Sequence, residues 1–417
     1  MKQYRTGALR LAAALLAGAS VFVLAPTAGA TGAAGPADAT GTADADGSAG
    51  AARSGGSSWP GAKVRPEQLQ QGLDALTGKA GASGATGELR QDGRVVWRGT
   101  SGVGDLSTGA PAPVDGTFRA GSVTKPFLAT VVLQLVGEGR VGLDQPIEHY
   151  LPGVVPNGSA ITVRQVMNHT AGLYDFTEDP RFAYDTEADQ RRLLDQDRWR
   201  TWSASELIAI GVSHPPYFPP GQGWHYSNTD YLLLGELVNK VTGHDWRSEV
   251  RHRVILPLGL WHTSLPGTAT GVPGPHSHGY LQLSDGPADV TDFNPSVAGA
   301  AGELISSNDD LARFDAALLG GRLLAPAQLA EMTSTVPGDV QPPTNYGLGL
   351  MELKLSCGSV WGHPGGIYGY LTYMFGDRAG RRQISVSVNP YDQSKGAALT
   401  PTAVALVDLA FCGPTKP

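Results

Sequence analysis

The chain has 417 residues, of which 41% are hydrophobic, and this composition predicts a globular protein with a sizeable core. The same hydrophobic fraction excludes disorder of the whole chain. The formal charge of -7 is modest and no stretch concentrates Lys and Arg, so nucleic acid is not expected as a partner.

Residues 1–30 form a candidate secretory signal peptide. A basic head with Lys2, Arg5 and Arg10 precedes an apolar stretch from Leu11 to Leu24, and residues 28–30 fit a cleavage site of small residues. The apolar stretch is shorter than the roughly 20 residues that span a bilayer, which argues against an uncleaved anchor. We therefore expect a secreted protein with no stable membrane anchor after cleavage, and a monomer.

A linker and the first structured elements follow. Residues 31–60 contain Gly, Ala, Ser, Thr and Asp with almost no large apolar side chains, which predicts a flexible linker before a folded domain over residues 61–417. Alternating residues on both sides of Asp92-Gly93 predict a β-hairpin. The apolar spacing after Pro126 predicts a buried helix that begins at or just after Ser122.

The rest of the chain divides into two regions. Residues of about 141–296 show helical patterns separated by loops rich in Pro and Gly, which predicts a mainly helical lobe. From about residue 297, a helix capped by Ser307 or Asn308 is followed by the strand-like segments "YLTYMFGD" and "RRQISVSVNP" and by a closing helix. The pattern predicts an α/β fold in which an antiparallel sheet flanked by helices, from about 64–140 and 297–415, carries the helical lobe.

Cys357 and Cys412 are the two cysteines of the chain. After export they would meet an oxidising environment, and they can pair in one way only. We predict a disulfide that ties the C-terminal segment to a late strand. Two separate buried thiols are the alternative, because distance decides pairing.

Ser122 and Lys125 form an S-x-x-K pattern directly before the apolar helix. One helical turn separates them, so the amine can reach the hydroxyl. A neutral, desolvated lysine can accept the proton of a serine, and a helix N-terminus favours a developing negative charge. A Ser N-cap followed by an exposed Lys gives the same pattern, and the motif alone does not separate the two interpretations.

Two further motifs follow in the chain. Tyr226-Ser227-Asn228 lies in a Pro/Gly loop before an apolar helix, and His363-Pro364-Gly365 precedes a strand-like segment. In this order, Ser-x-x-Lys, Tyr-x-Asn and His-x-Gly resemble the serine penicillin-recognising family of class C β-lactamases, D-alanyl-D-alanine carboxypeptidases and related esterases. The resemblance extends from about Phe118 to Cys412 and is closest to secreted D-alanyl-D-alanine carboxypeptidases.

The resemblance implies a covalent mechanism. Ser122 would form an acyl-enzyme, and Lys125 and Tyr226 would share the proton transfers, with a neutral lysine or a phenolate as the base. Asn228 would bind the amide of the acyl side chain and help to hold Lys125. The resemblance implies no metal and no organic cofactor.

The resemblance also implies a substrate-binding strand. His363 would add a donor or a positive field beside the leaving group. Gly365 and Gly366 would line the substrate site, with the backbone N–H groups of Ser122 and Gly366 forming the oxyanion hole.

Three positions depart from the carboxypeptidase pattern. Carboxypeptidases of this family typically carry Thr after the His, often a hydroxyl two residues further on, and an Arg on the preceding strand, which hold the terminal carboxylate of the substrate. Here these positions carry Pro364, Gly366 and Met351. Pro364 has no hydroxyl and Met351 has no guanidinium group, so we expect poor selection for a free carboxylate.

The sequence thus predicts a secreted serine hydrolase, with a D-alanyl-D-alanine carboxypeptidase acting on cell-wall peptides or related D-amino-acid amides as the main candidate. The substrate would be a small molecule or a peptide. An esterase or β-lactamase on the same scaffold is one alternative, and a catalytically silent penicillin-binding protein is another. His169 is expected to have a packing role, and His276 and His278 lack the partners of a metal site.

Overall fold

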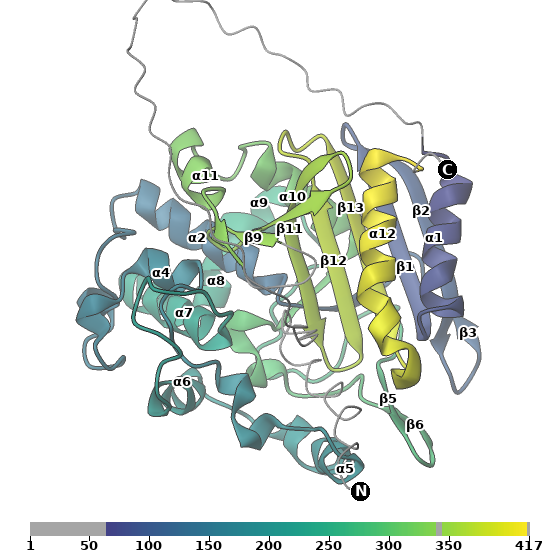
Figure 1. Cartoon of the computed structure of the whole chain (residues 1–417), viewed down its shortest axis with the longest axis horizontal. Helices are drawn as coiled ribbons and strands as arrows, with labels where there is room; N and C mark the ends of the chain where they lie inside the picture. The colour runs from purple at the N-terminus through teal and green to yellow at the C-terminus, as the bar shows by residue number, and fades with distance from the viewer. Residues whose placement is uncertain (1–63, 339–343, 415–417) are drawn as a thin grey trace, which may run out of the picture.

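A nine-stranded antiparallel sheet forms the centre of the computed structural model (Figure 1). The structure describes residues 64–338 and 344–414, so the predicted signal peptide and the whole predicted linker lie outside the described residues. The sheet confirms the predicted α/β fold class. In spatial order its strands are β3 (Ala110–Pro111), β2 (Arg94–Asp105), β1 (Ala82–Gln91), β13 (Arg382–Pro390), β12 (Tyr370–Gly376), β11 (Gly358–Ile367), β10 (Met351–Leu355), β9 (Thr344–Tyr346) and β8 (Val336–Pro337).

The hairpin of β1 and β2 forms where the sequence predicts it. Gln91 pairs with Arg94, and the two turn residues Asp92 and Gly93 have φ angles of 50° and 77°. A turn with two left-handed residues has the twist that matches the twist of the flanking strands. The Asp-Gly pair therefore fixes the register of the first two strands.

Two helices cover one face of the sheet (Figure 1). These are α1 (Pro66–Gly78) and α12 (Leu399–Cys412), and their apolar side chains form one core with strand residues such as Ile384 and Val386. Among the described residues, the segment Gln393–Cys412 is long and apolar enough to cross a membrane by length and composition. Leu406, Val407 and Phe411 of this segment are buried in the core.

The predicted pairing of the two cysteines is confirmed. Cys357 lies in the turn between β10 and β11, and Cys412 is the last residue of α12. Their sulfur atoms are bonded and their Cα atoms are 5.4 Å apart. The disulfide therefore attaches the C-terminal helix to the turn before β11, the strand that carries the His-Pro-Gly motif.

Helices from the middle of the chain cover the other face of the sheet and extend into a lobe. The helices are α2 (Thr124–Gly137), α3 (Ile147–Tyr150), α4 (Val163–Met167), α5 (Glu187–Asp195), α6 (Ala204–Ser213), α7 (Asn228–Thr242), α8 (Trp246–Val250), α9 (Leu256–Leu258), α10 (Asn308–Leu319) and α11 (Pro326–Met332).

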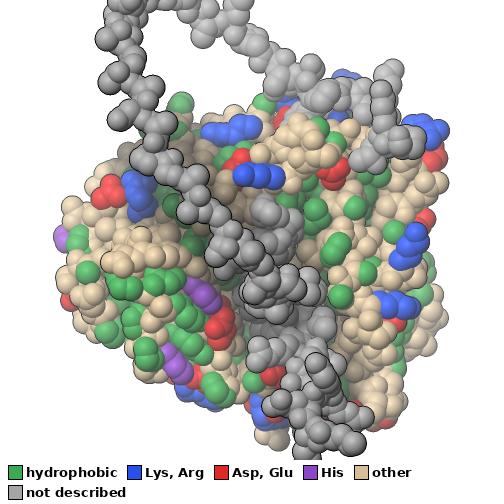
Figure 2. Space-filling model, in the orientation of Figure 1, with side chains coloured by type: hydrophobic (Ala, Val, Ile, Leu, Met, Phe, Trp, Pro, Cys, Tyr) green, Lys and Arg blue, Asp and Glu red, His purple; other side chains and the backbone are tan. Residues whose placement is uncertain are grey.

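On the face shown in Figure 2, basic and acidic side chains are interspersed rather than gathered in a stripe of one charge.

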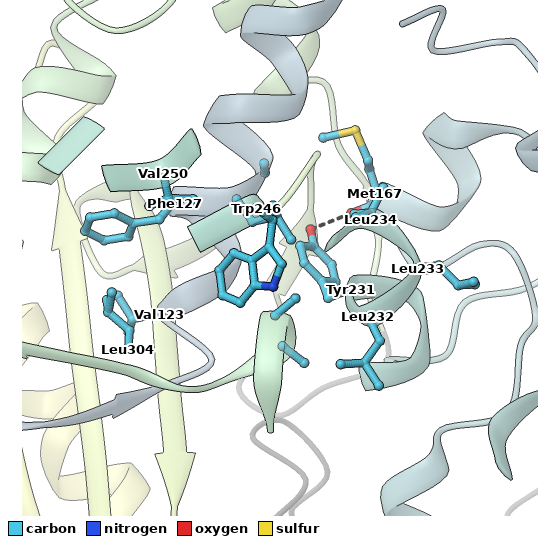
Figure 3. Close-up of a cluster of buried hydrophobic side chains, with 14 of the residues drawn as sticks. Val123, Phe127, Met167, Tyr231, Leu232, Leu233, Leu234, Trp246, Val250 and Leu304 are labelled. Carbon is cyan, nitrogen blue, oxygen red and sulfur yellow. Dashed lines mark hydrogen bonds between the residues drawn. The ribbon is translucent and has the colours of Figure 1, made fainter. Parts of the chain in front are cut away.

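A buried apolar cluster holds α2 and α7 together (Figure 3). Phe127 of α2 stacks on Phe314 of α10 with ring centroids 3.6 Å apart. Tyr231 of α7 donates a hydrogen bond of 2.9 Å to the carbonyl of Met167, at the end of α4. Because Ser122 precedes α2 and Asn228 begins α7, this packing fixes the two helix starts that carry the predicted site.

Two short strand pairs complete the fold. β4 (Thr117–Gly121) pairs with β7 (Leu304–Ser307), and β5 (Tyr280–Leu283) pairs with β6 (Gly286–Asp289). Ser307 caps α10 as predicted, since its side chain accepts a hydrogen bond from the backbone N–H of Asp310. β4 ends directly before Ser122 and contacts β11 and β12, so the β4–β7 pair positions Ser122 relative to the main sheet.

Replacing both cysteines by serine should lower the free energy of unfolding by about 4 kcal/mol, because the crosslink restricts a long loop of the unfolded chain. The two cysteines are 55 residues apart. Unfolding in guanidinium chloride, with the wild-type protein under oxidising conditions as the reference, measures the difference. A loss below about 1 kcal/mol would show that the bond adds little to stability.

Candidate active site

Ser122 lies in the turn between β4 and α2. Thr124 anchors this turn, because its hydroxyl donates to the carbonyl of Gly121 at 2.7 Å and accepts from the backbone N–H of Leu304 at 3.0 Å. Gly121 has a φ of 54°, and a Cβ at this position would come within 2.7 Å of the backbone of Gly366. A glycine is therefore required where the turn passes over β11.

Lys125 places its amine next to Ser122. Its Nζ lies 3.1 Å from Ser122 Oγ, 2.8 Å from Asn228 Oδ1 and 2.7 Å from the carbonyl oxygen of Ala301, and the side chain is fully buried. Burial lowers the pKa of Lys125 to about 7, although the negative charge of Asp175 acts in the opposite direction. A large share of the amine is therefore neutral at neutral pH and can accept the proton of Ser122.

The ring of Tyr226 lies beside the lysine amine. The centroid of its ring is 4.8 Å from Lys125 Nζ, and its hydroxyl has no hydrogen bond within normal distance limits among the described residues. Burial raises the pKa of Tyr226 well above its ordinary value, while the nearby hydroxyl of Ser122 lowers it. The phenol is therefore neutral, which makes Lys125 rather than a phenolate the candidate base, and Tyr226 can pass protons at Ser122.

Asp175 extends the network and was not predicted from the sequence. Asn228 Nδ2 donates to Asp175 Oδ2 at 2.9 Å, while Asp175 Oδ1 accepts from the backbone N–H of Thr177 at 3.0 Å. Burial raises the pKa of Asp175, and the hydrogen bonds with Thr177 act in the opposite direction. Both carboxyl oxygens accept hydrogen bonds, which favours the ionised carboxylate. Its sequence signal was only that of a residue capping a short helical turn.

His363 is buried beside this network. Its Nδ1 contacts the carbonyl oxygen of Pro364, which can only accept, so Nδ1 carries the hydrogen. Its Nε2 therefore accepts from the hydroxyl of Tyr346 at 3.0 Å. Burial and the charge of Lys125 lower the pKa of His363 to about 3. A neutral imidazole with hydrogen bonds at both nitrogens does not provide the positive field that was one of its two expected roles. Tyr346 is a site residue that the sequence did not indicate.

Gly365 and Gly366 lie where β11 meets the turn of Ser122. A Cβ at Gly365 would come within 1.9 Å of the carbonyl oxygen of Ala120 and 3.1 Å of the backbone nitrogen of Ser122. No side chain fits there, so the backbones of β11 and of the turn approach closely. This approach brings together the backbones of Ser122 and Gly366, the predicted pair of oxyanion donors.

The positions of the expected carboxylate clamp carry no charge. Met351 begins β10, is 2% exposed, and packs with Tyr226 and Tyr346. Pro364 lies in β11 opposite Tyr373. Since His363 is also neutral, none of these side chains provides a cation for a terminal carboxylate.

The three other histidines named from the sequence differ in their surroundings. His169, expected to have a packing role, is buried with its ring centroid 4.4 Å from that of Tyr226. His278 Nδ1 lies 2.6 Å from Asp289 Oδ2, and His276 stacks on His278. Within residues 64–338 and 344–414, no group of three or more His, Cys, Asp or Glu side chains could hold a metal ion.

Comparison with known families agrees with this geometry. The family model described as Beta-lactamase matches residues 69–409. The chain belongs to the Beta-lactamase family. The resemblance to serine penicillin-recognising proteins is thereby confirmed, and the chain is an enzyme of the serine hydrolase type.

Three relatives show the range of this family. A crystal structure of a D-stereospecific amidohydrolase from Streptomyces sp. is 41% identical with a TM-score of 0.74, over 84% of this chain and 100% of that one. A D-amino acid amidase from Ochrobactrum anthropi SV3, complexed with D-phenylalanine, is 28% identical with a TM-score of 0.70, over 82% and 97%. Esterase EstB from Burkholderia gladioli is 28% identical over 79% of this chain and 90% of the esterase.

The rate of Ser122 acylation should fall about tenfold per pH unit below about pH 7, because protonation removes the lone pair of Lys125. The pH dependence of kcat/KM for p-nitrophenyl acetate measures this fall. Lys125→Arg should lower kcat/KM by about 10³-fold. The matched control is Lys354→Arg, which changes an exposed lysine of β10 and should leave the profile unchanged.

Asp175→Asn should move the acid limb of the same profile to lower pH, because it removes a negative charge that raises the pKa of Lys125. The asparagine keeps the size of the side chain and a capping oxygen. The apparent pKa of kcat/KM is the quantity to compare with wild type. An unchanged or higher value would mean that Asp175 is not ionised in the resting enzyme.

Proposed function

We propose that this enzyme hydrolyses amides of D-amino acids through an acyl-enzyme on Ser122. The observation that carries the proposal is the uncharged set of Met351, Pro364, Gly366 and neutral His363, placed beside a complete Ser122 and Lys125 pair. Such a site suits a substrate whose leaving group carries no carboxylate.

The proton transfers follow from the contacts of Lys125. The neutral amine takes the proton of Ser122 as the serine oxygen bonds to the carbonyl carbon of the substrate. The carbonyl oxygen becomes an oxyanion beside the backbone N–H groups of Ser122 and Gly366. When the C–N bond breaks, Lys125 returns the proton, directly or through Tyr226, to the leaving nitrogen. Water then cleaves the ester at Ser122 with the same groups in reverse order.

The relatives support this substrate class over a carboxypeptidase. The Streptomyces protein is described as a D-stereospecific amidohydrolase, and the Ochrobactrum protein as a D-amino acid amidase. A D-alanyl-D-alanine carboxypeptidase must hold the free carboxylate of its substrate, and a bidentate Arg is the group best suited to that task. The buried thioether of Met351 stands at that position.

An esterase is the second candidate, and the similarity to Esterase EstB favours it. The leaving group of an ester is an alkoxide, and its departure depends less on protonation than the departure of an amine from an amide. Amide hydrolysis therefore depends more strongly than ester hydrolysis on the return of a proton from Lys125 or Tyr226.

Purified protein should release ammonia from D-phenylalaninamide at least about tenfold faster than from L-phenylalaninamide. The reason is that a difference in how the side chain of each enantiomer fits the pocket is worth about this factor. Ammonia release by a coupled assay measures both rates, with Ser122→Ala as the inactive reference. The same preparation is tested with p-nitrophenyl acetate, nitrocefin and an acylated D-Ala-D-Ala peptide. Ester cleavage without amide cleavage would favour the esterase. Release of D-alanine from the peptide faster than release of ammonia from D-phenylalaninamide would favour the carboxypeptidase.

A further inference from the structure

Tyr226 is bracketed by contacts from a single residue, His169. The backbone N–H of His225 donates to the carbonyl of His169 at 3.1 Å, and the backbone N–H of Ser227 donates to its Nδ1 at 3.2 Å. The imidazole lies against the phenol ring, with centroids 4.4 Å apart. His169 thus holds the backbone on both sides of Tyr226 and one face of its ring.

His169 adopts a backbone conformation that few side chains favour. It follows the end of α4, and its φ of 64° lies in the left-handed region that glycine and asparagine occupy most readily. A glycine would adopt this conformation without steric cost. Such a conformation persists where surrounding contacts fix the residue, and here both the imidazole and the carbonyl of His169 make such contacts.

Asp230, in the first turn of α7, fixes the imidazole. Its Oδ2 lies 2.9 Å from His169 Nδ1, and both side chains are buried. An N–H group can only donate, so the contact with Ser227 requires a lone pair on Nδ1. The hydrogen between Nδ1 and Asp230 is therefore assigned to the carboxyl group, and that of the imidazole to Nε2, which has no hydrogen-bond partner among the described residues.

Burial agrees with this proton position. It raises the pKa of Asp230 well above its ordinary value and lowers the pKa of His169 well below its own. Asp230 Oδ1 has no hydrogen-bond partner among the described residues, which costs less for a neutral acid than for a carboxylate. Asp175 differs, because both of its oxygens accept hydrogen bonds.

We propose that His169 is the positioning residue for Tyr226, and that a protonated Asp230 holds His169 without adding a charge to the site. Lys125 then faces one carboxylate, that of Asp175, instead of two. The proposal rests on acyl transfer at Ser122 and not on the identity of the substrate.

The first test measures how fast a fluorophosphonate probe labels Ser122, which needs no knowledge of the substrate. His169→Gly removes the imidazole and keeps the left-handed backbone, and it should slow labelling about 100-fold, as expected for a misplaced catalytic group. His169→Asn keeps a left-handed conformation and an acceptor oxygen for Ser227 and should recover about tenfold of the loss. The matched control is Asn157→Gly, at an exposed residue with a φ of 59°, and should label at the wild-type rate.

The Tyr226→Phe background separates positioning from stability. If His169 acts through Tyr226, adding His169→Gly to Tyr226→Phe should slow labelling no further, since the two changes remove one function. Equal losses in both backgrounds would indicate a merely structural role and overturn the proposal. If His169→Gly does not fold, Asp230→Ala replaces it, and wild-type labelling by that variant would also overturn the proposal.

The second test concerns the proton. Asp230→Asn retains an N–H donor for His169 and changes no charge if Asp230 is protonated, so the acid limb of the labelling rate should stay where it is in wild type. A shift to lower pH like that expected for Asp175→Asn would show that Asp230 is ionised and would overturn the assignment. Besides Asp230, the titratable groups that face His169 are Lys125, His225, Tyr226, Tyr231, Tyr346 and His363.

Discussion

The burial of one amine governs the site. Lys125 is removed from water by the packing of α2 against α7, and its Nζ has three oxygen atoms around it, of which none belongs to a carboxylate. A buried lysine with a directly bonded carboxylate would remain charged. Here Asn228 lies between the amine and the carboxylate of Asp175, and the pKa of Lys125 is about 7. Both protonation states of the amine are therefore populated at neutral pH. The apolar cluster of Figure 3 therefore has an electrostatic as well as a structural effect.

The surroundings of the amine are neutral for the same reason. His363 and Tyr226 are uncharged because they are buried, and Met351 brings a thioether to a place where an arginine would introduce a cation. A cation there would also lower the pKa of Lys125 further, because like charges disfavour the protonated amine. Substrate selection and base strength are thus linked through one electrostatic environment.

Local signals in the sequence were enough to predict much of the fold. Asp92 and Gly93 specify a turn by their own backbone preferences, and the one-turn spacing of Ser122 and Lys125 places both at a helix start. Tyr226 and Asn228 were found through a motif. Asp175, Tyr346 and Asp230 were missed, because each acts through contacts across the fold that leave no periodic pattern. The charge of His363 was also beyond the sequence, since it depends on burial, and His169 was assigned to packing although it touches Tyr226.

The close approach at Gly121 and Gly365 has a consequence for altering this enzyme. These two positions admit no side chain, so the predicted oxyanion hole is made of main chain. Variant libraries can leave both glycines fixed and diversify Met351, Tyr346 and Pro364 around them. Such libraries would change the side chains that a substrate meets while both glycines keep the close approach of the two backbones.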